Sequence, residues 1–226
     1  MPLQATSPGL VSATSNAFTV GAMTLALTIT PSASTITWGG SVVLTTRFAA
    51  NGANRTFGLW AARDKGDPAT FARIATLTTN TSGVSEFRYR PVTNLYYEAR
   101  ITGDADLAAA VSSQTRVVVR QIAILRPIAS ATIRSIARGT HITFTTTVRP
   151  SRPELTPASV TYWAFRRVNG VWRQYYTVNV RASATGLASF GWTFGSSGSW
   201  YVRSMANPTP YNANSAKSPV EVFNVC

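Results

Sequence analysis

An internal duplication is the feature that most constrains how this chain can fold. From Trp60 onward the sequence matches itself, without a gap, at an offset of 103 residues. The matched pairs are Trp60 with Trp163, Gly83 with Gly186, Phe87 with Phe190, Tyr89 with Trp192, Tyr97 with Trp200, Arg100 with Arg203, Ser112 with Ser215, Val117 with Val220, and Val119 with Val222. A sequence that repeats at a fixed period predicts one structural unit that occurs twice.

The duplication extends upstream at an offset of about 100. Val42, Leu44 and Phe48 match Ile142, Phe144 and Val148, and the three-residue difference falls where "RPSRPELTPAS" replaces "AANGANRT". Insertions are tolerated in loops, so we expect a loop there. The predicted domains are residues 23–120 and 121–226. The segment that joins them, "VVVRQIAILRP", has no Gly/Ser linker, which favours a stiff joint.

The opening stretch "SPGLVSATSNAFTV" resembles the end of an earlier copy. At an offset of 97, Ala13 matches Ala110, Ser15 matches Ser112 and Val20 matches Val117. Residues 1–22 are therefore predicted to be the last strands of a preceding repeat. Chance similarity among these small residues is the alternative. Under the first interpretation the chain is a piece of a longer array.

The local sequence pattern is that of β-strands throughout. In "VSEFRYR", Phe87 and Tyr89 share one face of the strand and charged residues share the other, as expected for a strand with one buried side. Turn signals such as Asn51-Gly52, Ser82-Gly83, Asn169-Gly170 and Ser197-Gly198 separate the apolar runs. We find no convincing helix, so the predicted fold class is all-β.

Two motifs in each copy resemble a known family. The pieces are "TTNTSGVSEFRYRP" with "YYEARITGDADLAAAVSSQTRVVV", and "RASATGLASFGWTF" with "WYVRSMANPTPYNANSAKSPVEVF". Together with copies of about 100 residues, they resemble the tandem immunoglobulin-like (Ig-like) repeats of bacterial secreted and cell-surface proteins. The resemblance implies two tandem Ig-like β-sandwiches at an extracellular or cell-surface location, with Trp60 and Trp163 as the buried core Trp. The second copy departs from the pattern at "NPTPYNAN".

Composition excludes several classes of protein. No run of eighteen apolar residues exists, so the sequence predicts no membrane span. The single cysteine, Cys226, excludes an internal disulfide framework and a cysteine metal cluster. We expect Cys226 to lie exposed beyond the last strand, where it either forms an intermolecular disulfide or is an incidental terminal residue.

Catalytic and metal-binding patterns are weak. Asp104 and Asp106 in "GDAD" have the oxygen ligands that calcium prefers, but a capped turn explains them better. Asp64 and Asp67 are interpreted as residues of a solvated turn, and His141 as an exposed strand residue. No nucleophile–base set or phosphate-binding loop can be assembled. The sequence therefore predicts no enzyme activity and no cofactor or metal.

The charge is unbalanced. The formal net charge is +13, and residues 121–226 carry eleven basic and two acidic side chains, a difference of +9. Such a field attracts polyanions, and Arg outnumbers Lys nineteen to two. No basic run exceeds the pair Arg166 and Arg167, so no specific nucleic-acid partner is predicted. Charges spread over the sandwich faces are the simpler interpretation. A wall polymer, an acidic polysaccharide or a lipid headgroup is the alternative.

One predicted hairpin is rich in aromatic residues. In "YWAFRRVNGVWRQYYTV", exposed rings would stack on sugars and arginines would add hydrogen bonds. The candidate glycan- or polyanion-binding residues are Trp172, Arg173, Tyr175, Tyr176, Arg166 and Arg167. Consecutive Tyr175 and Tyr176 are expected on opposite faces of the strand. The alternative is that these rings fill the core and cover the sheet edge.

These observations predict a non-catalytic structural, spacer or adhesive module of an extracellular bacterial multi-domain protein. It would self-associate along an array or through Cys226. The alternative function is a binding module for carbohydrate or an anionic cell-wall polymer. The sandwich fold itself does not choose between them, because it hosts many functions.

Overall fold

The protein is described here by a computed structural model that covers residues 4–5, 13–14, 26–49, 52–63, 68–104, 107–127, 134–151 and 158–226, except the Glu221 side chain. These residues form β-strands and turns with a single 3-10 turn, Pro68–Thr70. No helix in this part of the chain is long and apolar enough to cross a membrane. The predicted all-β class is confirmed.

The N-terminal sandwich packs two sheets face to face. One sheet has the order β3 (Leu27–Pro31), β5 (Val42–Phe48), β8 (Val84–Tyr89). The other has the order β4 (Thr35–Thr37), β11 (Thr115–Arg120), β9 (Leu95–Ile101), β6 (Thr56–Ala62), β7 (Ala72–Thr78), with β10 (Ala110–Val111) beside β9. Its core holds Val42, Leu44, Leu59, Tyr97 and Val117.

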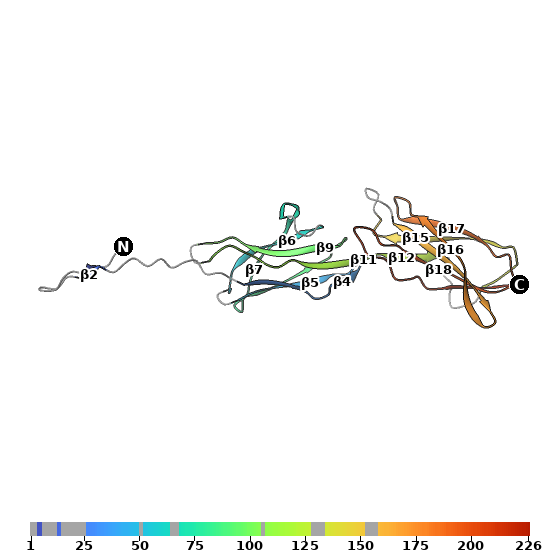
Figure 1. Ribbon diagram of the computed structural model, residues 1–226, viewed down its shortest axis with the longest axis horizontal. Coiled ribbons are helices and arrows are strands. Elements are labelled where there is room, and N and C mark those ends of the chain that lie inside the picture. Colours follow the sequence, from blue (N-terminus) through green and yellow to red (C-terminus); the bar gives the residue numbers. More distant parts are fainter. Residues whose placement is uncertain are drawn as a thin grey trace.

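The C-terminal sandwich repeats this plan. One sheet has the order β12 (Ile122–Arg126), β14 (His141–Arg149), β17 (Leu187–Thr193). The other has the order β13 (Arg134–Ile136), β19 (Glu221–Val225), β18 (Gly198–Ala206), β15 (Ser159–Val168), β16 (Val171–Arg181). Its core holds Phe144, Tyr162, Trp200, Val202 and Phe223. The two sandwiches lie end to end (Figure 1).

Strand pairing confirms the duplication. Leu44 lies opposite Phe87 in the first copy, and the matched Phe144 lies opposite Phe190 in the second. The turns before these strands also match, because Gly83 and Gly186 both adopt a positive φ, 72° and 80°. A side chain would be strained in that conformation, so both copies need glycine there.

The closing strand departs from the offset of 103. That offset pairs the buried Val119 with Val222, but Val222 is half-buried, and β19 buries Phe223 and Val225 instead. Strand pairing shows two steps: β18 is offset from β9 by 105 residues and β19 from β11 by 106, so two additional residues lie before β18 and one lies between β18 and β19.

A serine motif occurs once before the closing strand of the first copy and twice in the second. The hydroxyl of Ser112 accepts a hydrogen bond from the Ala99 N–H and donates to the next carbonyl along the chain. Ser215 and Ser218 each make the same two kinds of bond with β18 and with the carbonyl that follows. Both serines therefore tie the connection before β19 to β18.

The expected core tryptophans are elsewhere. Trp60 and Trp163 are only half-buried, because each lies on the outward side of its strand between buried neighbours. The large buried aromatics are Tyr97 and Trp200, which are 0% and 1% exposed. Trp60 instead lies under the guanidinium of Arg100, whose Cζ is 4.6 Å from the ring centroid. The implied role of Trp60 and Trp163 is therefore wrong.

A single residue links the two sandwiches. β11 ends at Arg120, β12 begins at Ile122, and Gln121 between them is 3% exposed. The Gln121 N–H donates to the Ala213 carbonyl at 3.1 Å, and its Nε2 donates to the Asn207 carbonyl at 2.8 Å. Both carbonyls belong to the connection between β18 and β19, residues 207–213, which we call the docking loop.

The docking loop contacts the N-terminal sandwich in turn. Asn212 is 1% exposed, and its Nδ2 lies 3.1 Å from the Val92 carbonyl and 3.2 Å from the Val119 carbonyl. The Asn94 N–H donates to the Tyr211 carbonyl at 2.7 Å. The sequence that departs from the repeat, "NPTPYNAN", is therefore the segment that joins the two sandwiches.

Little of residues 1–22 is described. β1 (Gln4–Ala5) pairs antiparallel with β2 (Ala13–Thr14), as β10 pairs with the end of β9. The rest of the predicted third copy lies outside the described residues.

Two buried tyrosines generate a prediction about stability. The Tyr162 hydroxyl donates to the Ala188 carbonyl at 2.8 Å, whereas the Tyr97 hydroxyl is buried with no hydrogen-bond partner. Tyr162→Phe is expected to lower the free energy of unfolding by about 1 kcal/mol, because it removes a hydrogen bond made in the interior. Tyr97→Phe should keep or raise that free energy. Urea denaturation measures both, and an equal loss in the two variants would contradict the prediction.

The same pair predicts a pH dependence. Burial, and secondarily the nearby Tyr89, raise the pKa of Tyr97 above its ordinary value of 10.0, and burial also raises the pKa of Tyr162. The unfolded chain ionises these phenols first, so their contribution to stability is complete below pH 10.0 and is lost as the pH rises further. Tyr97→Phe should make this alkaline loss shallower, as measured by urea denaturation across that range.

Candidate functional site

An aromatic cluster lies on the outward side of the five-stranded sheet in the C-terminal sandwich. Tyr201 on β18 has buried neighbours on both sides along its strand, so its ring points away from the core. Phe165 on β15 stacks on it at 4.5 Å between centroids, and Trp172 on β16 meets it edge-on at 4.7 Å. Trp172 is 36% exposed, and the other two are half-buried. We call Phe165, Trp172 and Tyr201 the outer aromatic cluster.

Two cations lie on the same side of this sheet. Arg203 follows Tyr201 by two residues on β18, and its Nε is buried without a hydrogen-bond partner. Lys217 places its Nζ 5.6 Å from the ring centroid of Trp163, which precedes Phe165 by two residues on β15. Positive charge therefore borders the aromatic cluster.

The N-terminal copy lacks the cluster. At an offset of 103, the positions of Phe165 and Trp172 are occupied by Ala62 and Ala69, and strand pairing places Tyr96 opposite Ala62 as Tyr201 lies opposite Phe165. Both copies form the same kind of sandwich, so the fold does not require aromatic rings at these positions. The cluster is a property of the second copy alone.

Glu98 shows what the second copy has lost. It is 4% exposed and accepts hydrogen bonds from Arg100 Nε and from Gln114 Nε2, the latter at 3.0 Å. Glu98 lies opposite Trp60, and the residue opposite the matched Trp163 is Arg203. The second copy therefore has a cation where the first copy has a buried carboxylate.

Other candidate residues lie on the opposite side of β16. Tyr175 contacts Trp192 and Trp200 at centroid distances of 6.2 and 5.0 Å, and Tyr176 contacts Trp192 at 5.0 Å. The two tyrosines were expected on opposite faces, and this expectation is wrong. Tyr175 is left unpaired at a β-bulge opposite Ala164, and the extra residue turns both rings toward β17. They are 59% and 41% exposed.

The arginines of the hairpin also lie on two different sides of the sheet. Arg167 lies opposite Trp172 across β15 and β16, on the side of the outer aromatic cluster, and its Nε donates to the Gly170 carbonyl. Arg166 pairs with Arg173 on the other side, and its Cζ lies 5.6 Å from the Trp200 ring. The structure thus separates the six predicted residues into two groups instead of one site.

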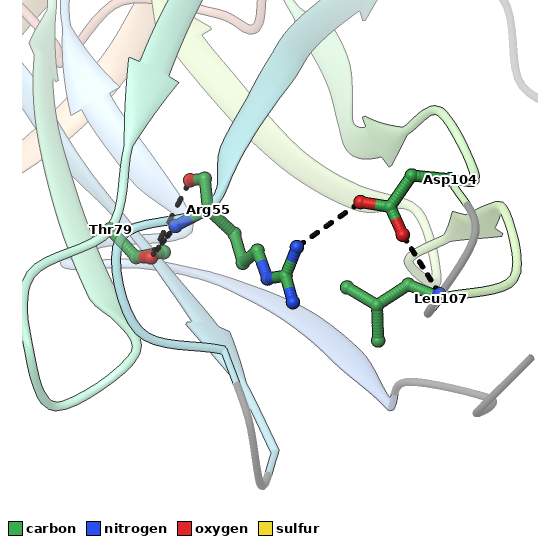
Figure 2. Close-up of polar contacts among 4 residues, drawn as sticks. All are labelled: Arg55, Thr79, Asp104 and Leu107. Atoms are coloured by element: carbon green, nitrogen blue, oxygen red, sulfur yellow. Dashed lines mark hydrogen bonds and ion pairs between the residues drawn. The ribbon is translucent and has the colours of Figure 1, made fainter.

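Asp104 holds a turn, as the sequence predicts (Figure 2). Its Oδ1 accepts the Leu107 N–H at 2.9 Å, and its Oδ2 lies 3.1 Å from Nη1 of Arg55. The backbone of Arg55 is held in turn by the Thr79 hydroxyl, 2.9 Å from the Arg55 N–H. Within the described ranges no group of three or more His, Cys, Asp or Glu residues is placed to hold a metal ion.

The structure also shows the positions of His141 and Cys226. His141 is exposed, as expected, with Nδ1 2.9 Å from the Thr193 hydroxyl. Cys226 is a free, exposed cysteine, as expected, and its N–H donates to the Ile136 carbonyl. Asp64, Asp67 and Asp106 lie outside the described residues.

Sequence reasoning missed Tyr201, Arg203 and Lys217, and it assigned Phe165 to the hairpin without counting it as a candidate. A usable signal was present. At an offset of 103, Ala62, Ala69, Ala72 and Arg73 in the first copy correspond to the aromatic residues Phe165, Trp172, Tyr175 and Tyr176 in the second.

Comparison with known proteins finds no matching family model and no curated protein that matches in sequence. Similar solved structures include the chicken interferon gamma receptor alpha chain, with 9% identity, a TM-score of 0.48, and coverage of 88% of this chain and 97% of that one. The D0–D1 domain of intimin has 15% identity, a TM-score of 0.29, and coverage of 88% and 97%. Trypsin-activated alpha-2-macroglobulin from Escherichia coli has 10% identity and a TM-score of 0.33, and 91% of this chain spans 16% of that protein.

The Asp104 turn generates a prediction. Asp104→Ala removes both the acceptor for the Leu107 N–H and the contact with Arg55, and is expected to lower the free energy of unfolding by about 1 kcal/mol. Asp104→Asn keeps an oxygen for the Leu107 N–H and should retain most of the stability, because the partly exposed ion pair contributes little. Thermal unfolding with and without calcium is the measurement. Stabilisation by calcium that Asp104→Asn abolishes would show a metal ligand instead of a cap.

Proposed function

We propose that this chain is a non-catalytic structural and adhesive module of an extracellular bacterial protein, in which two Ig-like sandwiches form one stiff rod. The hydrogen-bonded joint between the sandwiches is the observation that carries the proposal. A spacer holds its neighbours at a fixed distance and orientation only if its own domains do not rotate freely. The length of the linker and the contacts across it determine how freely the domains rotate.

Hydrogen bonds from buried polar side chains hold the joint together. Asn212 and Gln121 are almost completely buried, and both donate to backbone carbonyls across the joint. Separating the sandwiches would leave the contacting groups to find other partners, at a cost of about 1–3 kcal/mol for each group that stays buried and unpaired. Arg63 adds a contact on the surface, with its Cζ 5.2 Å from the Tyr211 ring.

The docking loop also supports this role. In the N-terminal sandwich the equivalent connection turns back on its own domain through Asp104 and Arg55. In the C-terminal sandwich the connection reaches the preceding domain through Asn212 and Ala213. The two copies share a core but differ in the loop that lies at the joint, as expected if the joint has its own role.

Removal of the Asn212 side chain tests the proposal. Asn212→Ala leaves the carbonyls of Val92 and Val119 without this donor, so the sandwiches should separate more readily. We expect a broader distribution of interdomain distances by small-angle scattering. The two sandwiches should also unfold in less coupled steps.

Asn214→Ala is the matched control. Asn214 is an exposed asparagine two residues after Asn212 and just beyond the docking loop, and its amide contacts only Met205 Sδ and the Ser215 carbonyl among the bonds seen. It should behave like the unchanged protein. Freely tumbling sandwiches in the unchanged protein, or equal effects of the two variants, would overturn the stiff-rod proposal.

A further inference from the structure

We propose that the outer aromatic cluster and Arg203 form a binding site for an acidic polysaccharide, in which a sugar ring packs on Trp172 and Tyr201 while a sugar carboxylate pairs with Arg203. This proposal goes beyond the structural role and does not rest on the stiffness of the joint. The site includes Tyr201 and Arg203, which lie on β18 outside the predicted hairpin. It also includes Phe165, which lies in the hairpin but was not one of the predicted candidates.

The aromatic side of the site follows from exposure and chemistry. Trp172 remains 36% exposed on an outward face where the first copy has alanine. Tyr201 adds a ring with a polar hydroxyl. Amphipathic rings of this kind are typical of recognition surfaces, and the C–H face of a pyranose packs against them. An open sheet face suits an extended polymer better than a small molecule, which prefers a concave pocket.

The charged side follows from the comparison of the two copies. Arg203 lies opposite Trp163 where Glu98 lies opposite Trp60, so the second copy has a cation in place of a carboxylate, and the buried Arg203 Nε has no hydrogen-bond partner. A ligand carboxylate would pair with the half-buried Arg203 guanidinium, since arginine binds carboxylates in a bidentate manner. Tyr201 and Arg203 share one side of β18 at a spacing of roughly 7 Å, close to the size of one sugar unit.

Charge complementarity selects the occupant. Residues 121–226 contain eleven basic side chains and only two acidic ones, Glu154 and Glu221. A neutral glycan would use Arg203, Arg167 and Lys217 as hydrogen-bond donors but would leave their charge unpaired, and a lipid surface would not need a row of stacked aromatics. A polymer that alternates sugar rings with carboxylates matches both features.

The test measures binding of the protein to polygalacturonate. The fully methyl-esterified polymer, which has the same sugar units without the carboxylate charge, is the control. Calorimetry or affinity electrophoresis of the full chain should show binding to the acid form that weakens as salt rises from about 0.05 M to about 0.5 M. Tyr201→Glu removes one ring and places a carboxylate two residues before Arg203, the spacing at which Glu98 accepts a hydrogen bond from Arg100. It should weaken binding by about tenfold or more, since one charged pair and one ring contact are lost.

Controls keep the result interpretable. Trp172→Ala, at an exposed position where the first copy has alanine, should weaken binding without lowering the melting temperature. Tyr175→Ala, on the opposite side of β16, should leave binding unchanged and serves as the matched aromatic control. Equal binding of the esterified polymer, binding to anionic vesicles but not to the polysaccharide, or an equal loss in Tyr175→Ala would each overturn the proposal, as would no binding to the acid form.

Discussion

Alternation of buried and outward residues along each strand is the constraint on which both sandwiches depend. Successive side chains of a strand point to opposite faces, so each sheet gives one set to the core and leaves the other free. Phe144, Thr146 and Val148 on β14 are fully or almost fully buried, and the residues between them are half-buried. Packing fixes the first set, because a change in volume there creates a cavity or a clash. The outward set can change, and the exchange of Glu98, opposite Trp60, for Arg203, opposite Trp163, is such a change.

The loops before the closing strands also differ between the two copies, because core packing does not constrain them. Asp104 closes a turn inside its own sandwich, whereas Asn212 at the matching end of the second copy donates to carbonyls of its neighbour. Both solve one physical problem, since polar backbone groups removed from water need partners. Only the second solution also fixes one sandwich against another. The docking loop of the second copy is therefore what connects the two sandwiches by hydrogen bonds.

The candidate site was only partly predictable. The aromatic hairpin and its exposed residues were visible in the sequence, and Trp172, Tyr175 and Tyr176 are indeed exposed. The bulge at Tyr175 was not visible, because one extra residue reverses the side on which every later side chain lies and leaves no mark in composition. Tyr201 was missed for another reason. It is distant in sequence from the hairpin and reaches Phe165 only because β18 pairs with β15.

The sequence by itself determined the all-β class, the duplication, and the turns at Gly83 and Gly186, because these depend on local alternation and on backbone conformations that only glycine adopts easily. Tertiary structure decided which aromatic residues fill the core. Trp60 and Trp163 looked like core residues by type, but the register of the sheets places Tyr97 and Trp200 inside and leaves the two tryptophans half-buried on the outward side. Tertiary structure also decided that residues 207–213 bind the preceding sandwich. The sequence pattern shows that successive side chains alternate between the two faces of a strand, but only the pairing of distant strands determines which face is buried.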